Sequence, residues 1–337
     1  MDLAKTLAML TAASAVERND ALAALNVAER AQLIDALQRG RTGRDEEQFV
    51  RDIFIATTGD ALGALKDAID DGSSYRDLHQ LLYRDIDDAA VRAAILAHFR
   101  TTAGEAPAAP SFKVLSDIDD TFYANWKDTR YPKKTVYPGV VAFYEALGGG
   151  LVFVSARPGD RTGFVENAAI ASLRARGIAK CTVLCGSFSH LLGNDRIAAK
   201  KYENFVEFRA LYPHHRFVFV GDSGQGDIAF GEMLLGDAEA SGVQAVFIHD
   251  VVATPEARRR ELAEKRIHLF DTYTGAAMAA HASGVLDLEG VSRVARATTE
   301  ELAAVPFATP AQREAREAEL DRDLAAVPGA RAGRLGG

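Results

Sequence analysis

From residue 112 onward the chain alternates short apolar runs with longer segments of helical spacing, and this alternation constrains the fold strongly. The apolar runs have the length of buried strands and lie at 112–117, 151–155, 181–185, 216–221, 243–248 and 267–270. Helices are predicted at 139–147, 161–176, 197–211, 226–236, 256–264 and 274–282. Strands that alternate with helices form largely parallel sheets covered on both faces. We therefore expect a Rossmann-like α/β domain over residues 112–285.

The rest of the chain reads differently. Residues 1–100 contain several runs with helical spacing, such as Leu33, Ile34 and Leu37, and predict a small all-α domain. Its apolar stripes could dock a membrane or a partner, but a small core explains them more simply. Residues 101–111 have the composition of a linker. Residues 286–337 predict a partly helical tail with a disordered end.

Composition excludes several classes of protein. The length of 337 residues suits about two domains. A net charge of −8 gives no basic field for nucleic acid. We expect no signal peptide and no transmembrane helix, since no run of about 18 apolar residues occurs. Cys181 and Cys185 lack the other ligands of a metal site, so we expect reduced thiols and a cytoplasmic location, with peripheral membrane contact left open.

Residues 114–121, Val-Leu-Ser-Asp-Ile-Asp-Asp-Thr, place acidic side chains at the end of the first predicted strand. Asp117 and Asp119 come at its carboxyl end, where open α/β sheets bind ligands, and Thr121 closes the turn. Carboxylates supply the hard oxygen ligands that Mg²⁺ prefers. The pair also suits phosphoryl transfer, because one carboxylate can attack phosphorus while the other moves the proton.

The letters Asp-Ile-Asp-Asp alone are not evidence for such a site, because they recur at 85–88. There they precede a segment of helical periodicity at 89–96 and predict a helix cap. The context of Asp117 must therefore decide its role.

Three later segments supply that context. In chain order their polar residues are Ser155 and Arg157 at the end of the second strand, Lys200 and Lys201 near the start of a helix, and Asp222 and Asp227 after the fourth strand. Catalysis of phosphoryl transfer is mostly positioning and electrostatic stabilisation, and these groups suit it.

The hypothesis gives each residue a role. Asp117 would form an aspartyl-phosphate, and Asp119 would protonate the leaving oxygen and then activate water. A lysine would neutralise phosphoryl charge. The predicted Mg²⁺ ligands are Asp117, Asp119, Asp222 and Asp227. The predicted phosphate contacts are Ser155, Thr121, Arg157, Lys133 and Lys134.

The segment 122–136 separates the first strand from the next helix. It contains Trp126, the single tryptophan, together with Lys127, Arg130, Lys133 and Lys134. Basic residues beside aromatic rings could grip an anionic phosphate or an anionic membrane surface. A solvated flap with one packed ring is an equally good interpretation.

The order of these motifs resembles the haloacid dehalogenase superfamily of phosphatases. More narrowly, the segments 116–121, 137–140, 212–213 and 221–225 resemble the catalytic domain of the actin-patch-associated phosphatidate phosphatase family. In that family a lysine precedes the Tyr/Phe-Pro pair by a helix's length, which favours Lys201 over Lys200. The resemblance covers about residues 111–283. Ser155-Ala156-Arg157-Pro158 departs from the Ser-Asn-Ser-Pro-like segment of many members.

The resemblance implies a haloacid dehalogenase domain with a short flap in place of a large cap. It also implies Mg²⁺-dependent dephosphorylation of phosphatidate to diacylglycerol, so that the expected partner is a phosphorylated lipid. Two alternatives remain open: a soluble phosphomonoesterase acting on a sugar, nucleotide or protein phosphate, and a non-catalytic phosphate-binding or interaction module. No protein partner is predicted.

Overall fold

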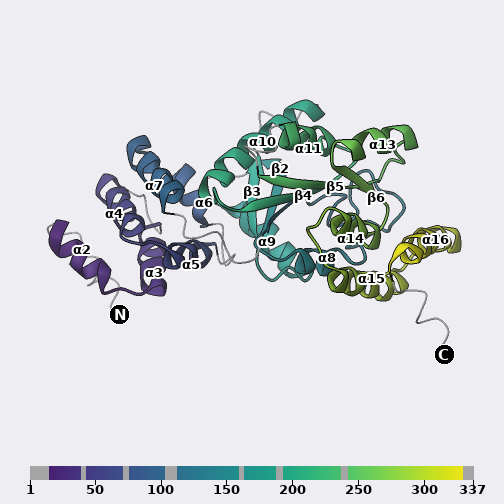
Figure 1. Ribbon diagram of the computed structural model, residues 1–337, viewed down its shortest axis with the longest axis horizontal. Coiled ribbons are helices and arrows are strands. Elements are labelled where there is room, and N and C mark those ends of the chain that lie inside the picture. The colour runs from purple at the N-terminus through teal and green to yellow at the C-terminus, as the bar shows by residue number, and fades with distance from the viewer. Residues whose placement is uncertain are drawn as a thin grey trace.

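A six-stranded, entirely parallel sheet forms the centre of the protein (Figure 1). The computed structural model describes residues 15–38, 43–70, 76–102, 112–158, 163–186, 193–236 and 242–328. The strands are β1 (Phe112–Ser116), β2 (Leu151–Pro158), β3 (Thr182–Gly186), β4 (Arg216–Asp222), β5 (Val243–His249) and β6 (Ile267–Phe270). Their order across the sheet is β3-β2-β1-β4-β5-β6. The predicted parallel α/β sheet is therefore confirmed.

The direction of the strand order reverses between β1 and β4. Val114 pairs with Leu151 of β2 on one side and with Val218 of β4 on the other. In open α/β sheets such a reversal leaves a crevice at the carboxyl ends of the strands, where ligands bind. The residues that follow β1 and end β4 meet at this crevice.

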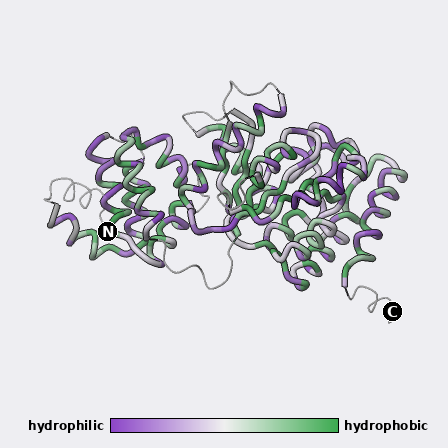
Figure 2. The backbone as a smooth tube through the Cα atoms, turned by 45° about the horizontal axis from the view of Figure 1, so that its top comes forward, coloured by the Kyte–Doolittle hydropathy of each residue, from purple (hydrophilic) through white to green (hydrophobic). Residues whose placement is uncertain are grey.

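Helices cover both faces of the sheet (Figure 1). One face carries α8 (Val140–Leu147), α9 (Phe164–Arg174), α14 (Tyr273–Ala282) and α15 (Leu288–Ala303). The other carries α10 (Asn194–Leu211), α11 (Asp227–Gly236) and α13 (Glu256–Glu264). Because both faces are covered, strands such as β1 are buried along their whole length. Figure 2 shows the central strands as predominantly hydrophobic, whereas hydrophobic and hydrophilic residues alternate along many of the helices.

The described residues before β1 form helices and no strand. They are α2 (Ala15–Ala23), α3 (Val27–Gln38), α4 (Arg44–Ile55), α5 (Asp60–Ile69), α6 (Leu78–Gln80), a π-helical turn (Leu81–Asp85) and α7 (Ala89–Thr101). Their buried apolar side chains form one continuous cluster with those of α10 and the adjacent sheet face. Most of the predicted linker, 103–111, lies outside the described residues.

The residues after 286 are also packed. Helix α15 contacts α8 and α14, and α16 (Pro310–Ala326) contacts α14 and α15. Leu302 and Leu320 belong to the core cluster on that face of the sheet. The predicted disordered end, from residue 329, lies outside the described residues.

The second copy of the acidic tetrapeptide has the predicted structural role. The carboxylate of Asp88 accepts hydrogen bonds from the N–H groups of Ala90 and Val91 at the start of α7. Cys181 and Cys185 are free thiols. Among the described residues, none of the helices has the length and apolar character needed to cross a bilayer.

Candidate metal centre

Three buried carboxylates converge at the crevice between β1 and β4. Asp117 follows β1, Asp222 ends β4 and Asp227 begins α11. One oxygen atom from each lies within 4.8 Å of the others. The backbone N–H of Asp117 donates to the carbonyl of Val220 (2.9 Å), which extends the sheet pairing into the site. Carboxylates gathered so closely could hold a metal ion.

Lys201 supplies the positive charge in this cluster. Its Nζ lies 2.9 Å from Asp117 Oδ1 and 2.5 Å from Asp227 Oδ1. Burial by itself lowers the pKa of this ammonium, but the attraction of Asp117 and Asp227 outweighs burial, so the pKa is raised. Lys200 instead pairs with Glu203 (2.9 Å) at the surface. The structure therefore places Lys201, and not its neighbour, at the carboxylates.

The electrostatics of the cluster favour a further cation. Asp222 Oδ1 accepts a hydrogen bond from the N–H of Gly224 (2.7 Å), whereas its buried Oδ2 has no partner among the described residues. Burial, and then the charges of Asp227 and Asp117, raise the pKa of Asp222 well above its ordinary value. Burial also raises the pKa of Asp117 to about 7, despite Lys201. An orphaned, buried carboxylate oxygen fits a hard metal ion.

The same hydrogen bonds separate the roles of the three carboxylates. Both oxygens of Asp227 are engaged, Oδ1 by Lys201 and Oδ2 by the backbone N–H of Asp222 (3.1 Å). Asp117 and Asp222 are therefore the better candidates for direct metal ligands, and Asp227 holds Lys201 beside them.

Asp119, predicted as a fourth metal ligand, is not part of the group that could share an ion. Its Oδ1 accepts a hydrogen bond from the side-chain amide of Asn125 (2.7 Å) in the flap, residues 122–136. Thr121 is fully buried, its Oγ1 has no partner among the described residues, and its carbonyl accepts from the Tyr273 hydroxyl (2.6 Å).

The other predicted phosphate contacts are dispersed. Ser155 is buried near the end of β2, and the side chain of Arg157 lies outside the described residues. In the flap, Lys133 Nζ lies 5.9 Å from the centre of the Trp126 ring, and Lys134 Nζ lies 4.2 Å from that of Tyr123. Both of these lysines therefore lie over aromatic rings of the flap.

The interpretation from sequence missed Asp120, which organises the flap. Its carboxylate accepts hydrogen bonds from the backbone N–H groups of Asn125 (2.7 Å), Trp126 (3.1 Å), Lys127 (2.6 Å) and Asp128 (3.4 Å). The backbone at Asp120 has a φ of 60°, a left-handed conformation that aspartate tolerates better than most residues. The signal in the sequence that could have revealed this role is the position of Asp120, an acidic residue directly before a segment without helical or strand periodicity.

Arg130 anchors the flap in the structure. It makes a bidentate pair with Asp128 (2.9 Å for each bond), and the Tyr137 hydroxyl donates to the same carboxylate (2.9 Å). Arg130 Nη2 also lies 3.2 Å from His249 Nε2. Burial, and then Arg130, lower the pKa of His249 to about 4, so this ring is neutral at pH 7.

The glycines around Asp222 allow close packing at the site. A Cβ on Gly221 would lie 2.6 Å from Asp227 Oδ2, and one on Gly224 would lie 2.8 Å from Lys127 Cγ. The flap thus packs directly on the loop that carries Asp222. Here glycine is required because of space and not because of a positive φ.

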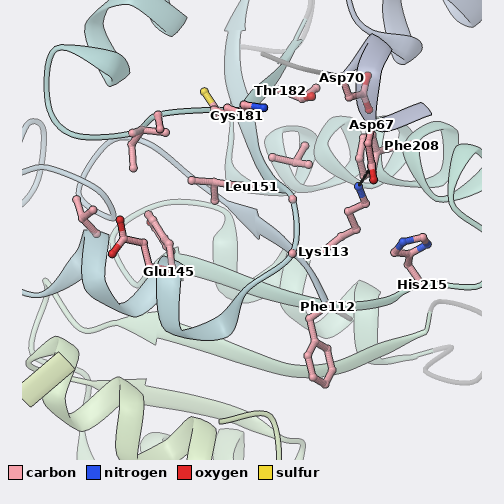
Figure 3. A pocket seen from close by; sticks show the side chains of 18 of the residues that line it. Asp67, Asp70, Phe112, Lys113, Glu145, Leu151, Cys181, Thr182, Phe208 and His215 are labelled. Atoms are coloured by element: carbon pink, nitrogen blue, oxygen red, sulfur yellow. Dashed lines mark ion pairs between the residues drawn. The ribbon is translucent and has the colours of Figure 1, made fainter. Parts of the chain in front are cut away.

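A separate cavity of about 460 Å³ lies at the opposite edge of the sheet, where β1, β2 and β3 begin (Figure 3). Lys113, at the start of β1, extends toward Asp67 of α5, with 3.7 Å between Nζ and Oδ1. The cavity therefore borders the contact between the N-terminal helices and the sheet. It lies away from the cluster of Asp117, Asp222 and Asp227.

Comparisons of the chain with protein-family models, with curated proteins and with solved structures found no match.

Proposed function

We propose that this protein is a Mg²⁺-dependent phosphatase that hydrolyses a phosphomonoester through an aspartyl-phosphate on Asp117. The observation that carries the proposal is the buried arrangement of Asp117, Lys201 and Asp222 at the crevice of the sheet. A carboxylate nucleophile, a fixed cation and an orphaned metal-ligand oxygen are the parts that phosphoryl transfer to aspartate requires. The order of the motifs in the sequence supports the same reaction.

In the first step of the proposed reaction, an oxygen of Asp117 forms a bond to phosphorus while the bond to the leaving oxygen breaks. Asp119, held by Asn125, gives its proton to that oxygen. Asp119 then takes a proton from water, whose oxygen attacks phosphorus and releases phosphate from Asp117. Lys201 balances negative charge throughout. Mg²⁺ held by Asp117 and Asp222 would offset the charge of the phosphoryl oxygens.

The proposed substrate is phosphatidate, which would yield diacylglycerol. Besides the resemblance in sequence, the flap supports a lipid substrate. Trp126 is 70% exposed, and the ammonium of Lys133 lies nearby. An exposed indole beside basic side chains is typical of surfaces that contact anionic membranes.

The catalytic proposal is tested with Asp117→Asn. We expect Mg²⁺-dependent hydrolysis of para-nitrophenyl phosphate and of phosphatidate to fall at least about 10³-fold, because an amide cannot replace the nucleophile. The control is Asp87→Asn, which makes the same change at an exposed aspartate of the second copy of the tetrapeptide. Equal activities of the two variants, or activity in the presence of a chelator, would refute the mechanism.

The substrate is tested with Trp126→Ala. For a lipid phosphatase, this variant should lose roughly tenfold of its activity on phosphatidate in anionic vesicles, since the interfacial anchor is gone. Activity on soluble para-nitrophenyl phosphate should not change. If the wild type hydrolyses soluble sugar or nucleotide phosphates but not phosphatidate, the soluble phosphomonoesterase is correct and the lipid proposal is wrong.

A further inference from the structure

A second cavity, of about 470 Å³, opens at the same edge of the sheet as the carboxylates. Its walls come from the flap, from the segment after β5, from α13 and from α16. Three arginines line it: Arg130, Arg259 and Arg316. The proposed phosphatase reaction uses none of them.

Two of the arginines are anchored by one edge of the guanidinium. Arg130 uses Nε and Nη2 to bind Asp128. Arg259 uses Nε and Nη2 to bind Asp250, and Nη2 also contacts Asp271. In both arginines Nη1 has no hydrogen-bond acceptor within the part of the chain that the structure describes.

Arg316 is the decisive residue. It is 9% exposed, and only Nη2 is paired, with Glu319 Oε1 (2.7 Å). Its Nε and Nη1 are buried without any acceptor among the described residues. An unpaired buried donor destabilises a folded protein, and a charged one does so strongly. A buried donor without a partner calls for an explanation, and a bound anion that supplies the missing acceptors is one.

The acidic residues that line the cavity are paired with arginines and do not supply acceptors for the free donors of Arg316. Asp250 and Asp271 are already paired with Arg259. Glu319 has a buried Oε2 without a partner in the described chain, and burial raises the pKa of its carboxyl group. The Glu319 carboxylate is itself paired with Arg316 through Oε1.

We propose that this cavity is a binding site for a free phosphate-like anion, with Arg316 as its principal ligand and Arg130 and Arg259 contributing charge. Guanidinium groups suit this chemistry because their planar donors match the oxygens of phosphate. The site is distinct from the carboxylate cluster but adjoins it, since Asp250 accepts a hydrogen bond from Ser223 (2.9 Å), next to Asp222.

The test measures binding of inorganic phosphate to the full chain in EDTA, by calorimetry and by thermal unfolding, against chloride at equal ionic strength. Phosphate should raise the Tm of the wild type, and Arg316→Met should weaken binding roughly tenfold or more. Arg293→Met, which removes an arginine from an exposed ion pair on α15, is the matched control and should bind normally.

The two sites are separated with Asp222→Asn, which alters the carboxylate cluster and should leave phosphate binding in EDTA intact. These readouts do not depend on turnover, so they stand even if the protein is not a phosphatase. If Arg316→Met does not fold, Arg316→Lys keeps the charge without the planar donors and should still bind phosphate more weakly. A wild type that responds to phosphate as to chloride, an arginine variant that binds normally, or loss of binding in Asp222→Asn would each overturn the proposal.

Discussion

Two adjacent lysines in α10 illustrate how position, and not residue type, creates a functional side chain. Ala198, Lys201, Phe205 and Phe208 recur at helical spacing and are all buried, so they lie on the face of α10 that packs on the sheet. Lys200 is one residue earlier, about 100° around the helix, and pairs at the surface. Only Lys201 therefore reaches Asp117.

The two lysines allow a matched pair of substitutions. Lys201→Met should lower the free energy of unfolding by about 3–5 kcal/mol, because it leaves buried carboxylates without a counter-charge. Lys200→Met should change it by no more than about 0.5 kcal/mol, since exposed ion pairs contribute little. Urea unfolding without added metal measures both. Similar losses in the two variants would contradict the assignment of Lys201 to the cluster.

At the scale of elements, the flap is ordered by polar contacts although it lacks regular secondary structure. Asp120 gathers four backbone N–H groups, and Asp128 is held by Arg130 and Tyr137. A carboxylate that accepts several backbone N–H groups acts much as a helix cap does, because it satisfies donors that would otherwise be left without partners. The flap should therefore behave as a defined element that depends on one side chain.

Asp120→Asn tests this dependence with little backbone strain, because asparagine also tolerates a positive φ. The amide cannot accept all four hydrogen bonds, so the flap should open more often. Tryptic cleavage after the lysines of the flap should become roughly tenfold faster than in the wild type, while the midpoint of global unfolding shifts little. Asp88→Asn, at the cap of α7, is the control. Unchanged cleavage of the flap would show that other contacts order it.

At the scale of the whole molecule, the N-terminal helices and the sheet share one core. Lys66 of α5 donates to the carbonyl of Leu211 at the end of α10 (2.8 Å) and lies 3.7 Å from the centre of the Phe99 ring. The hydroxyl of Tyr212 donates to Asp70. Burial, and then Lys113, lower the pKa of Lys66 to about 7. A lysine buried at this contact makes the stability of the whole protein sensitive to pH.

The direction of that sensitivity follows from proton binding. Between about pH 7 and pH 10.4 the unfolded chain keeps the Lys66 proton while the folded protein releases it, so Lys66 favours folding increasingly as pH rises. Below pH 7 the folded state must bury the charged form. Relative to Lys66→Met, the wild type should therefore gain about 3 kcal/mol between about pH 6 and pH 9.5, measured by urea unfolding. A difference that stays constant with pH would show that Lys66 titrates normally.

The sheet and the two principal carboxylates could be predicted because they depend on local pattern. Apolar runs alternate with helical spacing from residue 112, and polar residues after parallel strands must gather at one edge of the sheet. The sequence pattern thus predicts Asp117 and Asp222 at one edge of the sheet and a helix cap at 85–88, and the structure has them there.

Other features arise from contacts between segments that the sequence does not mark as neighbours. No local periodicity pairs Asn125 with Asp119 or assigns Arg130 to Asp128. Nor does it leave Nε and Nη1 of Arg316 without acceptors among the described residues. The shared core of the N-terminal helices and α10 likewise depends on how two separately patterned halves pack. Strand positions follow from the alternation of apolar residues along the chain, whereas the partner of a polar side chain is chosen by three-dimensional proximity and burial.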